Sequence, residues 1–215
     1  MAQLGNPSNP DVKVLDNTAN DAEWGIYADY TLGTIDKTDA NLHAASGWSG
    51  SSYAGTRYAA PFAIADVIYK AQALVRGGAP NLVFPYLAVH WSPLNDGDEP
   101  INYPAGDILT SHYIDGNIYI KGNAAEDTDE FDEVIIAHEW SHYFTDKFSR
   151  DDSLGNGHSL GELLDEPTAF SEGFATAQGA IICGTRYYTD TYRTSTGWAG
   201  FQIDVEADRM TDSAT

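Results

Sequence analysis

Positive charge is scarce in this chain. Its 11 lysine and arginine residues face 32 aspartate and glutamate residues, which gives a formal net charge of −21 at pH 7. Because such a surface repels a phosphate backbone, DNA or RNA binding is excluded as a function. Apolar runs of about 18 residues are also missing, so the sequence predicts no membrane span. Cys183 is the single cysteine; it cannot form an internal disulfide, and we expect it to be a small core residue.

The remaining composition is sufficient for one folded unit. Apolar residues make up 42% of the sequence and aromatic residues 12%, which argues against a disordered chain. We expect a single domain over residues 1–215, with a loop- and strand-rich part at 1–57, a core at 58–182 and a C-terminal segment at 183–215. The first ten residues show no signal peptide, and both ends resemble those of a piece of a longer chain.

Short apolar stretches between Gly, Asn, Asp and Ser predict strands. These stretches lie at 12–15, 24–32, 82–91 and 117–122. Pro85 places the strand at 82–91 at a sheet edge or a bulge, since proline cannot donate to the ladder. A first helix begins at Ala60-Pro61. Its buried stripe has helical spacing and consists of Ile64, Ile68, Ala71 and Val75.

A second predicted helix, at 127–148, contains the motif that could bind a metal and carry out catalysis. Asp127 as N-cap and Glu130 three residues later form a capping-box pattern at its start. Within the helix, His138-Glu139-Trp140-Ser141-His142 is an H-E-x-x-H sequence. Four residues are about 1.1 helical turns, so both imidazoles leave one face and can bind one zinc ion. Glu139 lies beside that ion, where a general base for a zinc-bound water belongs.

A tetrahedral zinc ion with one open position needs a third protein ligand. The metzincin pattern is absent, because Thr145 and Phe148 stand at its Gly and His positions. An Asp ligand in a G-T-x-x-D stretch is also absent, because Tyr188 stands at the Asp position after Gly184-Thr185. A glutamate from another helix remains, and Glu172 meets that requirement. Asp165 and Glu166 are competing carboxylates, ranked second because they lie at the start of that helix.

The helix that carries Glu172 is predicted over 165–182 and separates into two faces. We assign its core stripe to Phe170, Phe174, Ala177 and Ile181, and its opposite face to Asp165, Ala169, Glu172 and Thr176. Small neighbours, together with Gly173 and Gly179, allow the two helices to approach closely enough for Glu172 to reach the ion. Thr176, one turn after Glu172, is placed to support His138 by a hydrogen bond.

HEWSH followed by SEGFA resembles the gluzincins, the HExxH…E zinc peptidases that include thermolysin and the aminopeptidase N family. The spacing departs from both, since 29 residues separate His142 from Glu172, where those families use about eighteen or nineteen. The chain is more similar to a poorly characterised group of bacterial secreted or lipoprotein metallopeptidases, although Ser141 stands where their pattern usually has Gly. The similar stretches lie at 57–69, 90–95, 127–144 and 149–165.

This resemblance, over about residues 45–182, implies an α+β gluzincin fold. The expected architecture is a small mixed sheet, with the HExxH helix packed on a second ligand helix. The resemblance also implies zinc as cofactor, a peptide or protein substrate, and a secreted or cell-envelope location in a bacterium. Residues 117–122 would be the edge strand that pairs with an extended substrate.

Three alternatives stay open at the level of the sequence. The group that stabilises the oxyanion is sought in His158, within the Gly-rich loop between the ligand helices, or among Tyr187, Tyr188 and Tyr192. Residues 95–98 resemble half of a calcium loop but lack the later Glu of an EF-hand, so a solvated turn is the simpler interpretation. The alternative to a peptidase is a zinc-binding but inactive module of a larger cell-surface protein; the intact Glu139 favours the peptidase.

Overall fold

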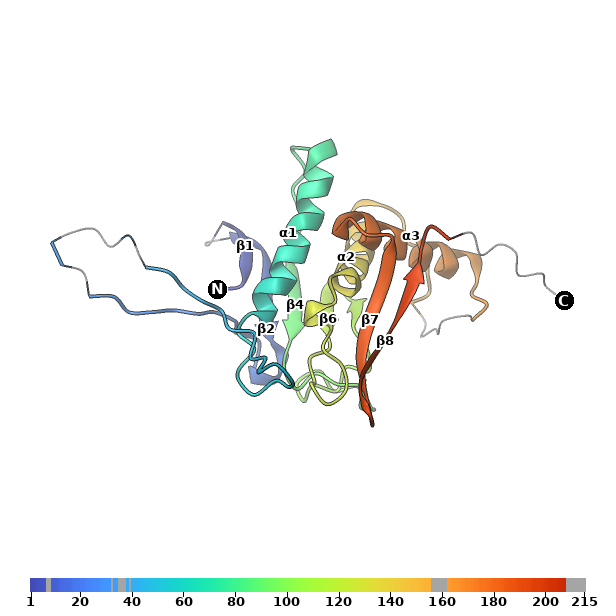
Figure 1. Ribbon diagram of the computed structural model, residues 1–215. Coiled ribbons are helices and arrows are strands. Elements are labelled where there is room, and N and C mark those ends of the chain that lie inside the picture. The colour runs from blue at the N-terminus through green and yellow to red at the C-terminus, as the bar shows by residue number, and fades with distance from the viewer. Residues whose placement is uncertain (7–8, 32, 35–37, 39, 156–161, 208–215) are drawn as a thin grey trace.

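The computed structural model describes residues 1–6, 9–31, 33–34, 38, 40–155 and 162–207. In these residues a mixed sheet and three α-helices form the body, and a two-stranded hairpin lies beside it (Figure 1). The protein is therefore of the α+β class with a mixed sheet. Within the same residues, each helix is too short or too polar to span a membrane.

The larger sheet has the strand order β1-β2-β4-β6-β5, and β3 pairs with β2. Its strands are β1 (Gln3–Asn6), β2 (Asn9–Asp16), β3 (Ala22–Glu23), β4 (Leu87–Trp91), β5 (His112–Ile114) and β6 (Asn117–Ile120). β2, β4 and β6 run parallel, whereas β1, β3 and β5 pair antiparallel with their neighbours. Every residue of β4 is buried, as expected of a central parallel strand.

The structure corrects three strand predictions. The strand predicted at 82–91 is confined to β4, which is central, because Pro85 lies before it and cannot join the ladder. Residues 24–31 form no strand. The strand predicted at 117–122 is confined to β6 and is not an edge strand. Asp115 and Gly116, both with positive φ, form a tight turn between β5 and β6, so that β5 pairs with the outer side of β6.

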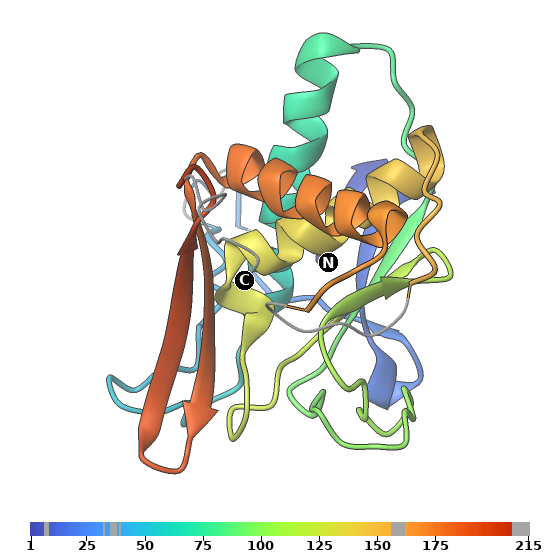
Figure 2. The same cartoon turned by 90° about the vertical axis from the view of Figure 1, so that its right-hand side faces the viewer.

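The helices are α1 (Ala60–Gly78), α2 (Glu133–Phe148) and α3 (Glu166–Cys183), with short 3-10 turns η1 (Asn17–Ala19) and η2 (Asp129–Phe131). The start of α1 and its buried residues Ile64, Ile68 and Ala71 confirm the prediction, whereas Val75, the last residue of the predicted stripe, is only partly buried. α2 contacts α1, α3, β5 and β6, and Figure 2 shows α3 lying against it. The helix with the H-E-x-x-H sequence is thus the central element of the molecule.

The predicted start of this helix is wrong. Asp127 is not the N-cap; η2 comes first, and Asp132 precedes α2. Glu130 does not close a capping box, because its carboxylate is fully buried and forms an ion pair with Arg57. The other oxygen of Glu130 accepts a hydrogen bond from the indole N–H of Trp91 at 3.3 Å. Pairing of this buried charge therefore overrides the local capping preference.

α3 has the predicted extent, and Asp165 caps it by accepting a hydrogen bond from the Thr168 N–H. Its predicted core stripe is wrong, since Phe170 and Ile181 are 70% and 66% exposed. The residues that α3 buries are mostly small: Thr168, Ser171, Ala175, Gly179, Ala180 and Ile182. The buried face of α3 is therefore set by the close packing of its small residues against α2, and not by the spacing of its large apolar residues. Cys183 is half-buried and packs against the core.

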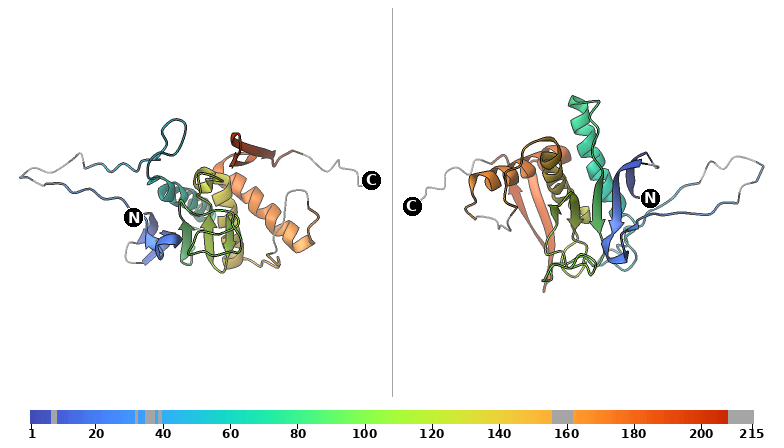
Figure 3. Two further views of the ribbon diagram at one scale, coloured as in Figure 1. Left: turned by 90° about the horizontal axis from the view of Figure 1, so that it is seen from below. Right: turned by 180° about the vertical axis from the view of Figure 1, so that it is seen from behind.

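The C-terminal segment, for which the sequence predicts no helix or strand, contains a β-hairpin. β7 (Tyr187–Thr194) pairs antiparallel with β8 (Gly197–Asp204). The hairpin lies at the end of the molecule opposite β1 (Figure 3). It docks on the start of α2, where the N–H and the hydroxyl of Thr191 both donate to Asp132. Residues of β7 are thereby held beside the helix with the H-E-x-x-H sequence.

Candidate metal centre

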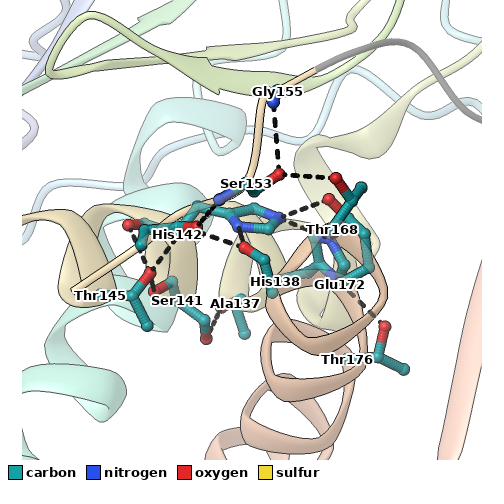
Figure 4. Close-up of polar contacts among 12 residues, drawn as sticks. Ala137, His138, Ser141, His142, Thr145, Ser153, Gly155, Thr168, Glu172 and Thr176 are labelled. Carbon is teal, nitrogen blue, oxygen red and sulfur yellow. Dashed lines mark hydrogen bonds and ion pairs between the residues drawn. The ribbon is translucent and has the colours of Figure 1, made fainter. Parts of the chain in front are cut away.

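The side chains of His138, His142 and Glu172 point toward one another between α2 and α3 (Figure 4). The two histidines leave the same face of α2, one helical turn apart. Glu172 comes from the facing side of α3, and its two carboxylate oxygens meet the two imidazoles. All three side chains are mostly buried, with exposed fractions of 10%, 15% and 20% in that order. The structure therefore brings together the three predicted ligands.

The distances among the three side chains match the requirements of a small tetrahedral ion. The Nε2 atoms of His138 and His142 lie 3.0 Å apart. Glu172 Oε2 lies 3.1 Å from His138 Nε2, and Oε1 lies 3.5 Å from His142 Nε2. For zinc bonds of about 2.0–2.1 Å, two ligand atoms of a tetrahedron are about 3.3 Å apart. Two nitrogen donors and one carboxylate oxygen are also ligands that zinc prefers, so the residues present fit a zinc ion.

Hydroxyl groups of α3 orient both imidazoles. Thr176 Oγ1 lies 3.2 Å from His138 Nδ1, so the predicted contact is confirmed. Ser171 Oγ lies 3.3 Å from His142 Nδ1, and its own proton is donated to Asp151. The Ser171 oxygen therefore accepts the Nδ1–H of His142, which leaves the Nε2 lone pair of that ring free to bind a metal.

The site shifts the pKa values of its carboxyl groups in opposite directions. Burial raises the pKa of Glu139, and the neighbouring His138 and His142 only partly oppose this rise. Burial also acts to raise the pKa of Glu172, but the hydrogen bonds with His138 and His142 outweigh it and hold that pKa well below the usual range. Two carboxyl groups on one site thus differ in basicity, an arrangement suited to one ligand and one proton acceptor.

Tyr188 of β7 is the aromatic residue beside the site. The ring centroids of Tyr188 and His138 lie 5.9 Å apart. Burial, followed by the charge of Glu139, raises the pKa of the Tyr188 hydroxyl far above its usual value. The other two tyrosine candidates, Tyr187 and Tyr192, are 39% and 37% exposed. The prediction for His158 falls outside the described residues.

The competing carboxylates lie away from the site. Asp165 is engaged as the N-cap of α3, and Glu166 is exposed. Neither belongs to the group formed by His138, His142 and Glu172. Among the described residues Glu172 is therefore the carboxylate that completes the three-residue group.

The expectation of a solvated turn at 95–98 holds only in part, because Asn95 is fully buried and donates a hydrogen bond to the Ile120 carbonyl, while Asp96 forms a β-bridge with Asp107. Asp96 accepts a hydrogen bond from the N–H of Asp98. Asp107 approaches Asp96 and Asp98 to form an acidic group, a partner that the sequence did not indicate. Asp98 itself is exposed.

Sequence reasoning missed the contributions of Ser171 and Asp151 to the site. Ser171 directly precedes Glu172 and was placed on neither assigned face of its helix. Asp151 lies in the loop that follows α2, and no local pattern distinguished it from its neighbours. Comparisons with known protein families, curated proteins and solved structures give no match to this chain.

Proposed function

We propose that this protein is a zinc peptidase of the gluzincin type, which hydrolyses peptide bonds with Glu139 as general base. The observation that supports the proposal most strongly is the convergence of His138, His142 and Glu172 at tetrahedral spacing. A purely structural zinc site would have no need of a buried, basic carboxyl beside the ligands. The secreted or cell-envelope location implied by the resemblance belongs to the same proposal.

His138, His142 and Glu172 are the residues that would hold the metal. When bound, zinc supplies a Lewis acid for a carbonyl oxygen and lowers the pKa of water toward about 7. Thr176 and Ser171 keep the imidazoles in the required tautomer and orientation. The low pKa of Glu172 keeps its carboxylate charged.

Glu139 moves the proton in this mechanism. Its carboxylate accepts a proton from the attacking water and later delivers it to the amine nitrogen that leaves. Burial raises the pKa of this carboxyl, which brings its basicity closer to that needed at neutral pH. The reaction converts one peptide bond and one water into a carboxylic acid and an amine.

Tyr188 is the proposed donor to the oxyanion. Its phenol has an ordinary pKa of 10, which burial raises further, so it is protonated at neutral pH and can donate a hydrogen bond. Its ring lies against His138, close to where a carbonyl oxygen would be polarised. Among the candidates in the described residues, Tyr188 is the one in contact with a ligand residue.

The proposed binding edge for an extended peptide is β5, in place of the strand expected at 117–122. β5 pairs with β6 on one side and ends the sheet on the other. An edge strand presents unpaired backbone groups that can pair with a peptide in extended conformation. β5 contacts α2, and His112 of β5 opposes a small part of the rise that burial causes in the pKa of Glu139, so this edge lies near the site.

The test is a digest of a mixed peptide pool by the zinc-loaded protein, read by mass spectrometry. We expect cleavage by the wild type and none by Glu139→Gln, since the amide keeps the shape and loses the basicity. The variant should still bind one zinc ion and unfold at the same temperature. A wild type that binds zinc but cleaves nothing would instead support the inactive zinc-binding module.

A further inference from the structure

Four aspartates meet where the β7–β8 hairpin docks on the start of α2. Three of them, Asp127, Asp129 and Asp132, come from η2 and its flanks, and Asp190 comes from β7. Each offers a carboxylate oxygen, and these oxygens all lie within 4.8 Å of one another. We call this group the hairpin aspartates. None of them belongs to the proposed zinc site.

The hairpin aspartates contain buried oxygens without hydrogen-bond partners. Asp129 is 4% exposed. Its Oδ2 accepts a hydrogen bond from Ser111, and its carboxyl group lies against that of Asp127. Within the described part of the chain, no N–H or O–H group donates to its Oδ1. Oδ1 of Asp127 and Oδ1 of Asp190 are also buried and accept from no N–H or O–H group of the described residues. Since an unsatisfied buried carboxylate oxygen is costly, three at one place indicate a ligand that meets them together.

Protein cations do not balance the charge of the hairpin aspartates. Lys121 is the basic residue that pairs with them in the described ranges, at 3.8 Å from Asp127, and it also lies 3.5 Å from Glu126. Burial raises the pKa of Asp129 well above its usual range. Burial and the charge of Asp127 raise the pKa of Asp190 to about 6. The group therefore gains from either protons or a cation.

We propose that the hairpin aspartates bind a calcium ion, which holds the β7–β8 hairpin against the start of α2. Calcium takes 6–8 oxygen ligands at about 2.3–2.6 Å, including several carboxylates, so four carboxylate oxygens that converge at one place can share one such ion. Magnesium usually uses only one or two carboxylates and keeps its waters. An all-oxygen donor set is also a poor match for zinc or copper, which favour nitrogen and sulfur.

The ion would link two parts of the chain that are distant in sequence. Asp129 and Asp132 lie just before or at the start of α2, whereas Asp190 lies on β7, two residues after Tyr188. Hydrogen bonds from Thr191 to Asp132 and from the Arg193 N–H to the Glu126 carbonyl hold the same contact. Calcium thus sets how firmly β7 is docked. Its binding does not depend on the proposed hydrolysis.

The experiment compares three proteins freed of calcium on a chelating resin, with one equivalent of zinc restored. They are the wild type, Asp190→Asn, and Asp98→Asn as the matched control, since the exposed Asp98 belongs to the other acidic group, with Asp96 and Asp107. Calcium is titrated by calorimetry, and the midpoint of thermal unfolding, Tm, is measured with and without calcium. Asp127→Asn is a second variant, to be used if Asp190→Asn does not fold.

We expect one calcium per chain in the wild type and in Asp98→Asn. At about a hundred times Kd, calcium should raise their Tm by about 5–10 °C. Asp190→Asn should bind calcium at least about tenfold more weakly. Without calcium, this variant should unfold at a higher temperature than the wild type, because one of the repelling charges is gone.

Two results would overturn the proposal. If calcium neither releases heat nor raises the Tm of the wild type, the hairpin aspartates hold protons instead. If Asp98→Asn abolishes binding while Asp190→Asn leaves it intact, the calcium site is the group of Asp96, Asp98 and Asp107.

Discussion

Gly179 of α3 lies directly against the backbone of His138 on α2. A β-carbon at Gly179 would lie 3.3 Å from the His138 amide nitrogen and 3.2 Å from the Val134 carbonyl oxygen. Both neighbours are helix backbone and cannot move aside easily. The absence of a side chain here therefore sets how closely the helix with Glu172 approaches the helix with the histidines.

We predict that Gly179→Ala forces α3 away from α2. The variant should lose about 1–3 kcal/mol of unfolding free energy and bind zinc more weakly, because Glu172 moves with α3. Gly173→Ala is the matched control, since a β-carbon there meets open space. It should leave zinc binding intact and stabilise the helix by about 0.5–1 kcal/mol. Urea unfolding and chelator competition measure both quantities; equal effects of the two substitutions would contradict the prediction.

The two hydroxyls that orient the imidazoles should influence zinc affinity without contacting the ion. Removing the hydrogen bond by Ser171→Ala or Thr176→Ala should weaken zinc binding about 10–100-fold in each case. Thr196→Ala, at the turn between β7 and β8, should bind as the wild type does. Affinities that stay unchanged in the first two variants would show that the imidazoles need no such support.

Tyr188→Phe tests the donor to the oxyanion. Loss of the hydroxyl should lower kcat about a hundredfold and change KM little, because the hydrogen bond strengthens as charge develops. The variant should retain its zinc. Tyr192→Phe on the same strand is the control and should keep wild-type kcat. If Tyr188→Phe is fully active, the donor is another group.

Glu130 should make the folded protein less stable as the pH rises. Burial, only partly opposed by Arg57, raises the pKa of Glu130 from 4.5 to about 7. Between these values the folded protein keeps a proton that the unfolded chain has lost, so stability present at low pH is lost as the pH rises through about 7. The difference in unfolding free energy between wild type and Glu130→Gln should therefore fall by about 2–3 kcal/mol from pH 5 to pH 8. Parallel stability curves would show that this carboxyl is charged throughout.

The parts of the site that could be predicted from sequence follow from helix geometry alone. His138 and His142 are four residues apart in a helix, so their common face needs no tertiary information. Glu172 followed from the need for a third ligand and from the small residues around it. Thr176, which the sequence places to support His138, does contact it. The turn between β5 and β6 also had a local signal, Asp115-Gly116, which the prediction of an edge strand at 117–122 overlooked.

The parts that could not be predicted depend on contacts between distant segments. Glu130 reads as a helix-capping residue until Arg57, 73 positions earlier, provides a buried partner. Phe170 and Ile181 fit a core stripe by their spacing, yet α3 turns its small residues inward, because Ser171, Ala175 and Gly179 let it pack closely on α2. Asp190 joins three aspartates from around η2 only because the hairpin folds back onto α2.

The most direct test of the zinc centre is a crystal of the zinc-loaded protein measured on both sides of the zinc absorption edge. An anomalous difference map should contain a peak between the side chains of His138, His142 and Glu172, with bonds of about 2.0–2.2 Å. A zinc peak at another group of side chains, or a Glu172 carboxylate turned away from the ion, would contradict the account.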